Sequence, residues 1–324
     1  MKVHILDDWF DTLSGLPCFD LLAGHDVTVW TDHQPDEAIL ADRLQDADCV
    51  VLFRERTKVT RGLLERLPNL RLISQRGAYP HVDVAACTDQ GVLLCSNEGA
   101  DGANHAAAEL TFALILAAMR QLPQQMASVK AGNWQMGVGR SLRGRRLGLY
   151  GYGRIGRVVA DYARAFGMKV VWWGSDAGRA RAKADGETVP ESRAAFFGTC
   201  DVVSLHLRLT SETRGSVTAD DLGAMPPRSV LVNTSRAGLI AEGALLQALN
   251  AGHLGAAAVD VFDFEPLTDP SDPLLSHPKM IATPHIGFVT EDEFDKQFAD
   301  IFEQVNAYAA GAPIHMINPS VYAP

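Results

Sequence analysis

Long apolar runs are absent from the sequence. A membrane-spanning helix needs about 20 consecutive apolar residues, and the longest candidate, residues 110–119, is bounded by Glu109 and Arg120. The first ten residues, MKVHILDDWF, resemble a β-strand rather than the apolar region and small-residue cleavage site of a signal peptide. We therefore expect neither membrane association nor secretion.

Cysteine is scarce and lacks the spacing of a metal or redox site. The five cysteines form an odd set without a C-x-x-C pair, which argues against a disulfide framework and against a zinc site. They are Cys18, Cys49, Cys87, Cys95 and Cys200. The sequence thus predicts reduced, mostly buried thiols, no bound metal and a cytoplasmic location.

Positive charge is in deficit. The sequence has 29 Lys and Arg side chains against 39 Asp and Glu side chains, a formal net charge of −10. Such a protein has no general electrostatic attraction for nucleic acid or for an anionic membrane surface. Any anionic ligand must therefore be held by local groups. The hydrophobic content of 47% is also too high for intrinsic disorder.

The length and the hydrophobic pattern predict two α/β domains. A single core usually stops growing at about 250–300 residues, and this chain has 324. Short apolar runs alternate with segments of helical period, which is the pattern of parallel sheets covered by helices. The expected strands form a first series at residues 3–6, 27–30, 49–53, 70–74 and 92–95, and a second at 146–150, 169–173, 202–205, 229–233, 256–261 and 280–282.

Two helices predict how these domains are connected. A long apolar helix over residues 103–122 suits a connector between the two series of strands. The last helix begins at Thr290, which can form a capping box with Glu293, and ends at Gly311. Because no strand follows this helix, it cannot extend the second sheet, and we expect it to pack on the first domain. The first domain is then discontinuous.

A glycine motif marks a dinucleotide site. The stretch RRLGLYGYGRIGRVV contains Gly-x-Gly-x-x-Gly directly after a predicted strand and at the start of a predicted helix. In that setting Gly151 allows the tight turn, Gly153 lets the backbone approach a pyrophosphate, and Gly156 lets the helix pack closely on the strand. The amides of Arg154 and Ile155 at the helix N-terminus would receive the phosphates.

The end of the next strand leaves the choice of dinucleotide open. NAD-binding domains usually carry an acidic residue there for the ribose hydroxyls, but this sequence continues with Gly174 and Ser175, followed by Asp176. Asp176 could reach the ribose from a displaced position, whereas Arg179 and Arg181 could attract a 2′-phosphate. We expect NAD as the cofactor and keep NADP as the alternative.

Three further motifs follow predicted strands of the second series: VNTSRAG, DVFDFEP and TPHIG. They contain an arginine, a carboxylate and a histidine, namely Arg236, Glu265 and His285. Arg236 can pair with a substrate carboxylate and polarise the neighbouring carbonyl group. His285 can exchange a proton with the substrate oxygen, and Glu265 can orient the imidazole and favour its protonated form. Since doubly wound folds bind ligands at the carboxyl ends of their strands, these residues predict hydride transfer to a 2-oxo acid.

These motifs, in this order, resemble the D-isomer-specific 2-hydroxyacid dehydrogenase family over nearly the whole chain. The similarity also covers VLFRERTKVT, VDVAACTDQGVLLCSN, AAAELTFALILA and VSLHLRLTSETRGSV. It implies that Arg236, Glu265 and His285 are catalytic. It further implies that Asp260 touches the nicotinamide carboxamide, and that His206 and Thr234 line the cofactor site. Members are usually homodimers.

The resemblance also assigns the domains. It implies a Rossmann-type dinucleotide-binding domain, residues 102–289, inserted into a flavodoxin-like substrate domain made of residues 1–101 and 290–324. Both domains are expected to be doubly wound parallel sheets.

The substrate loop departs from the family pattern. Ala78 replaces the usual glycine, Pro80 removes an amide, and Arg76 adds a positive charge that could favour a dianionic substrate. Arg54 and Arg56 resemble the arginines that face substrate phosphate in phosphoglycerate dehydrogenases; the alternative is that they are solvated surface residues. The substrate-binding candidates are Arg54, Arg76, Gly77 and Ala78.

Two functions are compatible with these observations. The first is an NAD(P)-dependent dehydrogenase or reductase acting on a small D-2-hydroxy or 2-oxo acid, with glyoxylate, hydroxypyruvate and the phosphoglycerate type all open. The second is a cofactor-sensing regulatory protein on the same scaffold without turnover. Such a sensor needs a partner-binding groove or added tails, and the sequence has neither an evident tail nor a basic patch.

Overall fold

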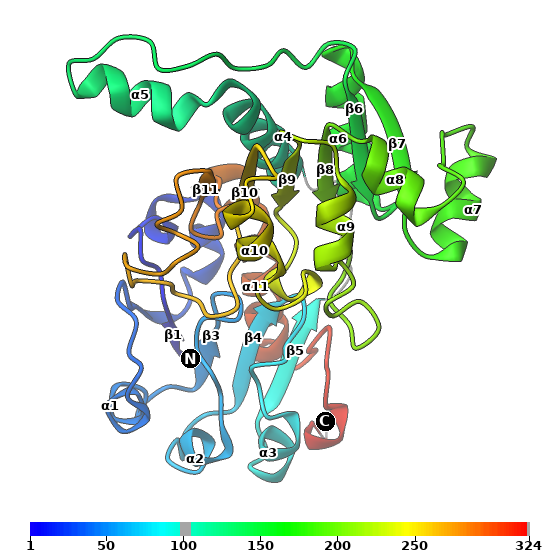
Figure 1. Cartoon of the computed structure of the whole chain (residues 1–324). Helices are drawn as coiled ribbons and strands as arrows, with labels where there is room; N and C mark the ends of the chain where they lie inside the picture. The colour runs from blue at the N-terminus through cyan, green and yellow to red at the C-terminus, as the bar shows by residue number, and fades with distance from the viewer. Residues whose placement is uncertain (98–104, 323–324) are drawn as a thin grey trace. The chain divides into compact units, whose positions relative to one another are not determined.

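The computed structural model describes residues 1–97 and 105–322, and the chain forms two compact units (Figure 1). Unit 1 consists of Met1–Asp101 and Thr290–Pro324, and unit 2 of Gly102–Val289. The chain passes from unit 1 to unit 2 among residues 98–104, so the expected boundary after residue 101 and the expected start of the connecting helix at residue 103 lie outside the described residues.

Unit 1 contains a parallel sheet of five strands in the order β2-β1-β3-β4-β5. This 2-1-3-4-5 order is that of flavodoxin. The strands are β1 (Lys2–Ile5), β2 (Asp26–Val29), β3 (Cys49–Val51), β4 (Leu72–Arg76) and β5 (Leu93–Asn97). The helices between them are two 3-10 helices, η1 (Leu13–Gly15) and η2 (Pro17–Leu22), and three α-helices, α1 (Glu37–Arg43), α2 (Arg61–Leu64) and α3 (Val84–Asp89).

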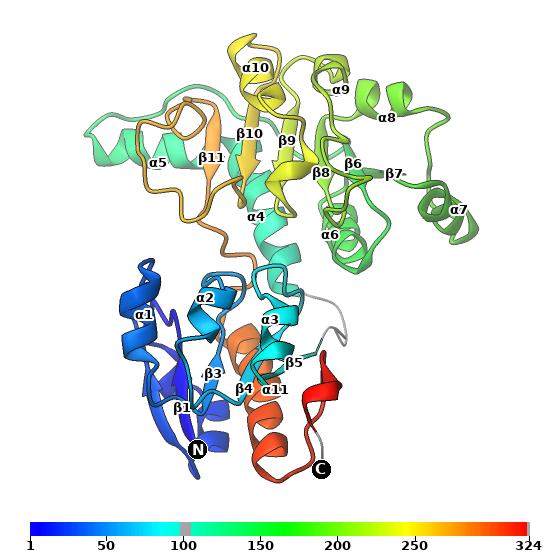
Figure 2. The same ribbon diagram turned by 90° about the horizontal axis from the view of Figure 1, so that it is seen from below.

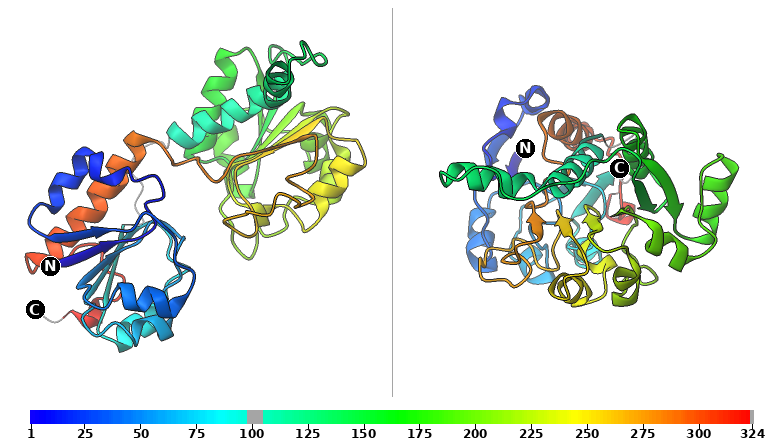
Figure 3. Two further views of the ribbon diagram at one scale, coloured as in Figure 1. Left: turned by 90° about the vertical axis from the view of Figure 1, so that its left-hand side faces the viewer. Right: turned by 45° about the horizontal axis from the view of Figure 1, so that its top comes forward.

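The C-terminal helix α11 (Glu291–Ala309) belongs to unit 1. It packs on β4, β5 and η2, while α1 to α3 cover the other face of the sheet (Figures 2 and 3). Thr290 caps the helix by accepting from the amide of Glu293. Phe294 and Phe298 meet the ring of Phe53 at centroid distances of 5.1 and 4.8 Å. The apolar stripe of α11 is therefore buried against the sheet, and a short 3-10 helix, η4 (Pro319–Val321), follows.

Unit 2 contains a parallel sheet of six strands in the order β11-β10-β9-β8-β6-β7. The strands are β6 (Arg146–Tyr150), β7 (Lys169–Trp173), β8 (Val202–Leu205), β9 (Val230–Asn233), β10 (Ala256–Val259) and β11 (Met280–Ala282). On the outer edge of β7, the amide of Trp172 donates to the carbonyl of Thr188 (2.9 Å), at the position that the third strand has in the Rossmann order 3-2-1-4-5-6. The strand order reverses between β6 and β8: the chain adds β7 on one side of β6 and then β8 to β11 on the other.

Successive side chains along the strands point to opposite faces of this sheet, and a layer of helices covers each face. Val202 and Val230 lie in one core with α4 (His105–Arg120) and α6 (Arg154–Ala165). Their neighbours Val203 and Leu231 lie in a second core on the other face. That core is formed with α8 (Arg193–Thr199), α9 (Ala219–Ala224) and α10 (Ala244–Asn250), and the remaining helices are α5 (Leu122–Lys130), α7 (Asp176–Ala184) and the 3-10 helix η3 (Ala237–Leu239).

The connecting helix is shorter than predicted. Instead of continuing to residue 122, α4 ends at Arg120, and Gln121 takes a left-handed conformation with φ of 55°. Pro123 then lies in the first turn of α5, where a missing amide costs nothing, so the chain starts a new helix.

In the ranges 1–97 and 105–322, no helix has the length and apolarity to cross a membrane. The same ranges contain no cluster of three or more His, Cys, Asp or Glu side chains suited to a metal ion.

Candidate active site

The glycine turn between β6 and α6 has the geometry that a dinucleotide site requires. Gly151 has a φ of 121°, and a Cβ there would lie 2.3 Å from the carbonyl oxygen of His206. A Cβ on Gly156 would come within 3.1 Å of both the Gly151 carbonyl oxygen and the Trp172 ring. The fold therefore requires glycine at residue 151, and at residue 156 a side chain would press α6 away from the turn and from Trp172 of β7.

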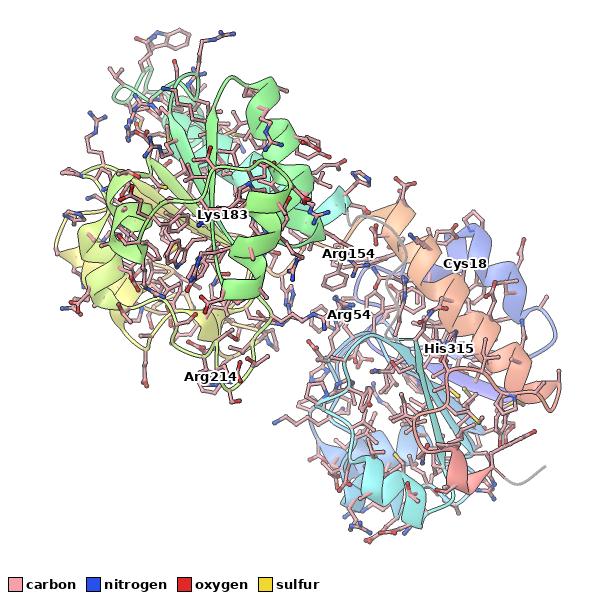
Figure 4. The ribbon with its side chains drawn as sticks, turned by 90° about the vertical axis from the view of Figure 1, so that its right-hand side faces the viewer. Cys18, Arg54, Arg154, Lys183, Arg214 and His315 are labelled. Carbon is pink, nitrogen blue, oxygen red and sulfur yellow. The ribbon has the colours of Figure 1, made fainter. Side chains whose placement is uncertain are left out.

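Gly153 differs from these two glycines, because the fold itself does not need it. Its φ is −118°, and nothing lies within 4 Å of a Cβ built there. It is the N-cap of α6, which has no side-chain cap and no acidic residue in its first turn; Arg154, labelled in Figure 4, is the first helical residue. A helix N-terminus with open space before it fits a pyrophosphate, since amide groups and the helix dipole both favour an anion there.

At the end of β7 the charges are already paired. Gly174 has a φ of 154°, and the Ser175 hydroxyl caps α7 by accepting from the Gly178 amide. Arg179 stacks over the ring of Trp173 at 4.4 Å, donates to the Gly174 carbonyl (2.5 Å), and forms an ion pair with Asp176. Arg179 thus lies beside the backbone of Gly174, with its charge balanced by an exposed carboxylate.

Glu265 and His285 form a hydrogen-bonded dyad. His285 Nδ1 lies 2.6 Å from Glu265 Oε2, and the amide of Phe262 donates to Glu265 Oε1 (2.8 Å). Partial burial favours the neutral carboxyl group, but these two hydrogen bonds and the charges of His285 and Arg236 outweigh it, so the pKa of Glu265 lies below its ordinary value. The carboxylate is therefore ionised near neutral pH and fixes the ring through Nδ1, which leaves Nε2 to exchange a proton.

Arg236 follows β9 in a turn held by a residue that the motifs did not single out. Asn233, which is 1% exposed, donates from Nδ2 to the Arg236 carbonyl (2.9 Å) and accepts from the Ser235 amide (3.1 Å). The Arg236 guanidinium donates to the Ser235 carbonyl (2.7 Å). An Asn at a strand end two residues before a polar residue is the sequence signal of such a turn, and it was available in VNTSRAG.

His206 and Thr234, which are expected to line the cofactor site, each form a hydrogen bond with the hydroxyl group of another side chain. His206 Nε2 lies 3.0 Å from the hydroxyl of Ser204, and burial lowers the pKa of His206 to about 4, so the ring is neutral. Thr234 shares a 2.7 Å hydrogen bond with Thr111 of α4, whose hydroxyl also donates to the Ala107 carbonyl. The Thr111 contact was not predicted, because it joins residues far apart in the sequence.

Asp260 directs its carboxylate at the backbone that carries His285. It is fully buried and accepts from Thr283 Oγ1 (2.6 Å), from the amide of Ile286 (2.9 Å) and from the amide of Gly287 (2.9 Å). Burial raises the pKa of Asp260, and the three hydrogen bonds oppose that rise.

The substrate candidates lie in unit 1, at the end of β4 and beyond β3. Arg54, labelled in Figure 4, has a φ of 61°, and its Nη1 lies 3.6 Å from where a Cβ on Gly77 would be. Arg76 pairs with Asp300 of α11 (3.3 Å). The Ala78 carbonyl accepts from the side-chain Nε2 of Gln75 (3.3 Å). Arg54 therefore lies beside Gly77, whereas the charge of Arg76 is paired with Asp300.

Of the two alternatives for Arg56, a phosphate-facing arginine or a solvated surface residue, the structure argues against the second. Its guanidinium carbon lies 4.0 Å from the ring centre of Trp9 and 4.1 Å from that of Phe53. It donates to the Asp7 carbonyl (2.6 Å), and burial lowers the pKa of Arg56 to about 10. Arg56 thus braces the loop that carries Arg54.

Residues 112–287 match the model of the NAD-binding domain of D-isomer specific 2-hydroxyacid dehydrogenases. A glyoxylate reductase of Thermococcus litoralis is 30% identical over 313 residues, with 92% of each chain covered. A D-3-phosphoglycerate dehydrogenase of Methanocaldococcus jannaschii is 35% identical over 275 residues, which cover 84% of this chain and 52% of that protein. The chain thus spans about half the length of the first curated relatives it matches.

Among solved structures, a putative D-3-phosphoglycerate dehydrogenase from Ralstonia solanacearum superposes with a TM-score of 0.94 and 43% identity, covering 100% of this chain and 98% of that one. The predicted fold class, two parallel-sheet α/β domains with a Rossmann-type domain, is confirmed by this likeness. The chain belongs to the family of D-isomer-specific 2-hydroxyacid dehydrogenases.

Proposed function

We propose that the chain is an NAD(P)-dependent oxidoreductase that interconverts a small D-2-hydroxy acid and its 2-oxo acid. The observation that carries this proposal is the hydrogen-bonded dyad of Glu265 and His285, which follows strands of the same sheet as the open glycine turn at Gly153. A carboxylate-held imidazole is suited to general acid–base work, and the turn is suited to a dinucleotide. The names of the relatives, glyoxylate reductase and D-3-phosphoglycerate dehydrogenase, agree with it.

Each catalytic residue has one task in this reaction. The bound nicotinamide cofactor supplies or accepts the hydride at C2 of the acid. In the reducing direction, His285 donates its Nε2 proton to the C2 oxygen and regains a proton from solvent. Glu265 holds the ring through Nδ1 and balances its positive charge. Arg236 pairs with the substrate carboxylate and polarises the carbonyl group.

The two units divide the binding tasks in this proposal. Unit 2 binds the cofactor at Gly151, Gly153, Arg154, Ile155 and Gly156, with His206 and Thr234 lining the site. Unit 1 is the substrate domain, and its candidates are Arg54, Arg76, Gly77 and Ala78. The positive charge of Arg54 favours an anionic substrate, and its position beside Gly77 suits a second anionic group, as in phosphohydroxypyruvate.

A screen of 2-oxo acids with NADH and NADPH tests the proposed function. Glyoxylate, hydroxypyruvate, phosphohydroxypyruvate and pyruvate are supplied in turn, and oxidation of the reduced cofactor is followed by absorbance. We expect turnover of at least one of them. Tight NADH binding without turnover of any would favour the cofactor-sensing protein instead.

The open space at Gly153 allows a clean test of cofactor binding. Gly153→Ala meets no atom within 4 Å and has an ordinary φ, so the thermal unfolding midpoint should stay within about 2 °C. The methyl group would occupy the space that a pyrophosphate needs, and we expect the Kd of NADH, measured by fluorescence, to rise at least about tenfold. Gly223→Ala is the matched control, since its Cβ also meets nothing within 4 Å. Unchanged NADH affinity in G153A would remove this turn from the cofactor site.

The pairing of Asp176 with Arg179 sets the expected cofactor preference. Because Asp176 balances the arginine, we expect the wild-type protein to use NADH more efficiently than NADPH. Asp176→Asn frees the guanidinium for a 2′-phosphate, and the ratio of kcat/KM for NADPH to that for NADH should rise about tenfold, the size of one charge-assisted contact. Asp161→Asn is the control, because Asp161 pairs with Arg164 at the same i,i+3 spacing. A wild-type preference for NADPH contradicts the first expectation.

A row of exposed apolar side chains supports a homodimer. Helix α5 has no buried residue, and Met126 and Val129 are 59% and 55% exposed. Trp134 and Val138, which follow, are 76% and 82% exposed. Apolar side chains gathered in this way usually mark a protein interface, and we propose that a second copy covers them.

Charge placed in that row should separate the copies. We expect the wild-type chain to sediment as a dimer at micromolar concentration. M126E/V129E should sediment as a monomer, because the free energy needed to bury two carboxylates exceeds the free energy of the apolar contact. Ile39→Glu on α1, at a site 49% exposed, should leave the dimer intact. A monomeric wild-type protein, or a dimer that survives M126E/V129E, argues against this interface.

The state of the cysteines supports a cytoplasmic location. All five are buried free thiols, and burial raises the pKa of Cys18, Cys87, Cys95 and Cys200 to about 12. Unpaired cysteines persist in reducing compartments.

A further inference from the structure

We propose that Asp260 is a positioning residue for His285: its carboxylate fixes the segment of residues 283–287 in the conformation that presents the imidazole to Glu265. The inference rests on the proposed function, because it concerns the group that exchanges the proton. This task is additional to the nicotinamide contact that the family resemblance implies for Asp260.

The three hydrogen bonds of Asp260 lie on both sides of His285. Before it, Thr283 donates its hydroxyl to Oδ1 (2.6 Å). After it, Ile286 donates its amide to Oδ1 (2.9 Å) and Gly287 donates its amide to Oδ2 (2.9 Å). Because Oδ1 receives two donors and the residue has no exposed surface, most of the bonding capacity of the carboxylate is spent on this segment.

The backbone of His285 needs such a restraint. Its φ is 54°, in the left-handed region that a residue with a side chain enters only at a cost in free energy. A strained conformation persists when the surrounding structure imposes it, and the bonds from Asp260 to the two amides that follow His285 supply that restraint. Without them the segment can relax toward negative φ, which would turn the ring away from Glu265.

The segment is also shaped to bring its backbone up to the carboxylate. A Cβ on Gly287 would lie 3.2 Å from Asp260 Oδ2 and 3.8 Å from Ala107 of α4, so glycine permits the close approach. Asp260 itself is tied to the sheet, since its amide donates to the Asn233 carbonyl (3.0 Å) and Thr283 donates its amide to the Val259 carbonyl (3.0 Å). These hydrogen bonds fix the segment that carries His285 to the ends of β9 and β10.

A double-mutant cycle separates positioning from other roles. In D260N one oxygen becomes an NH2 group that cannot accept, so we expect kcat for 2-oxo acid reduction to fall about 100-fold, the cost of a misplacement of about 1 Å. In an H285A background the same change should lower kcat less than about twofold, since the residue it positions is gone. The Kd of NADH should change far less than kcat, and by the same factor in both backgrounds, because a nicotinamide contact of Asp260 does not depend on His285.

The outcomes are distinct. If the kcat losses of D260N and H285A multiply in the double mutant, the inference is overturned. A Kd for NADH that rises in D260N as much as kcat falls also overturns it, because the loss of a direct cofactor contact would then explain the effect. If the wild-type protein turns over no 2-oxo acid, the proposed function fails, and the second measurement below still decides the positioning.

Two further variants guard against a folding defect in D260N. Thr283→Val removes one donor and keeps the shape, and it should lower kcat in the same direction by about tenfold, whereas Thr283→Ser restores the hydroxyl and the rate. Independently of turnover, the Nδ1 proton in the 2.6 Å bond to Glu265 should give a downfield proton resonance that vanishes in T283V and D260N while the fold is kept. A resonance that persists in both variants contradicts the proposal.

Discussion

His285→Ala lowers kcat for 2-oxo acid reduction by about 10²–10⁴-fold, the usual contribution of a positioned general acid, while the Kd of NADH changes less than about twofold. This is the largest effect we expect in the molecule. The ring is held at 2.6 Å from Glu265 Oε2, so its removal eliminates the proton donor without disturbing a core; the side chain is 24% exposed. Steady-state rates and NADH fluorescence titration measure the two quantities.

Two variants test whether this loss belongs to the dyad. His105→Ala changes an exposed histidine of α4 and should leave kcat unchanged. Glu265→Gln keeps the shape of the side chain but removes the charge opposite the ring. Because the pKa of Glu265 lies below its ordinary value, the wild-type carboxylate is charged from pH 5 to 8, and the variant lacks that charge throughout this range. We expect kcat in E265Q to fall about tenfold or more. A kcat for H285A within threefold of the wild-type value would exclude His285 as the proton donor.

Arg236→Gln is expected to lower kcat/KM by about 10²–10³-fold, because it removes the charge-assisted pair with the substrate carboxylate. Arg236→Lys should recover only part of this loss, since an ammonium group keeps the charge but cannot form the two parallel hydrogen bonds of a guanidinium. The turn around Arg236 is held by Asn233 through the backbone, so both variants should fold normally.

Comparing the change in KM with the change in kcat in R236Q reveals the role of Arg236. A rise in KM alone would indicate a group that only binds substrate, whereas a fall in kcat as well indicates polarisation of the carbonyl in the transition state. Arg143→Gln, at an exposed site of the same unit, is the control. Equal kcat/KM in R236Q, R143Q and the wild-type protein would remove Arg236 from the site.

Most strands could be predicted from the sequence because their signal is local. The strands at residues 146–150, 169–173 and 202–205 are observed within the predicted bounds. The errors are at the ends. The run over residues 256–261 was predicted as one strand, but β10 ends at Val259 because Asp260 turns its carboxylate to the segment of residues 283–287. Apolar content alone does not indicate where such a side chain leaves the sheet.

The sequence alone determined the family, the two sheets and the residue types of the site, since glycine spacing and polar residues at strand ends are local patterns. Only the tertiary structure decided what each of these residues contacts. The hydrogen bond of Thr234 with Thr111, the burial of Arg56 between two rings, and the three hydrogen bonds of Asp260 could not be predicted from the motifs. The physical reason is that hydrogen bonds and ring contacts between residues distant in the chain depend on how sheets and helices pack, and a local pattern carries no record of that packing.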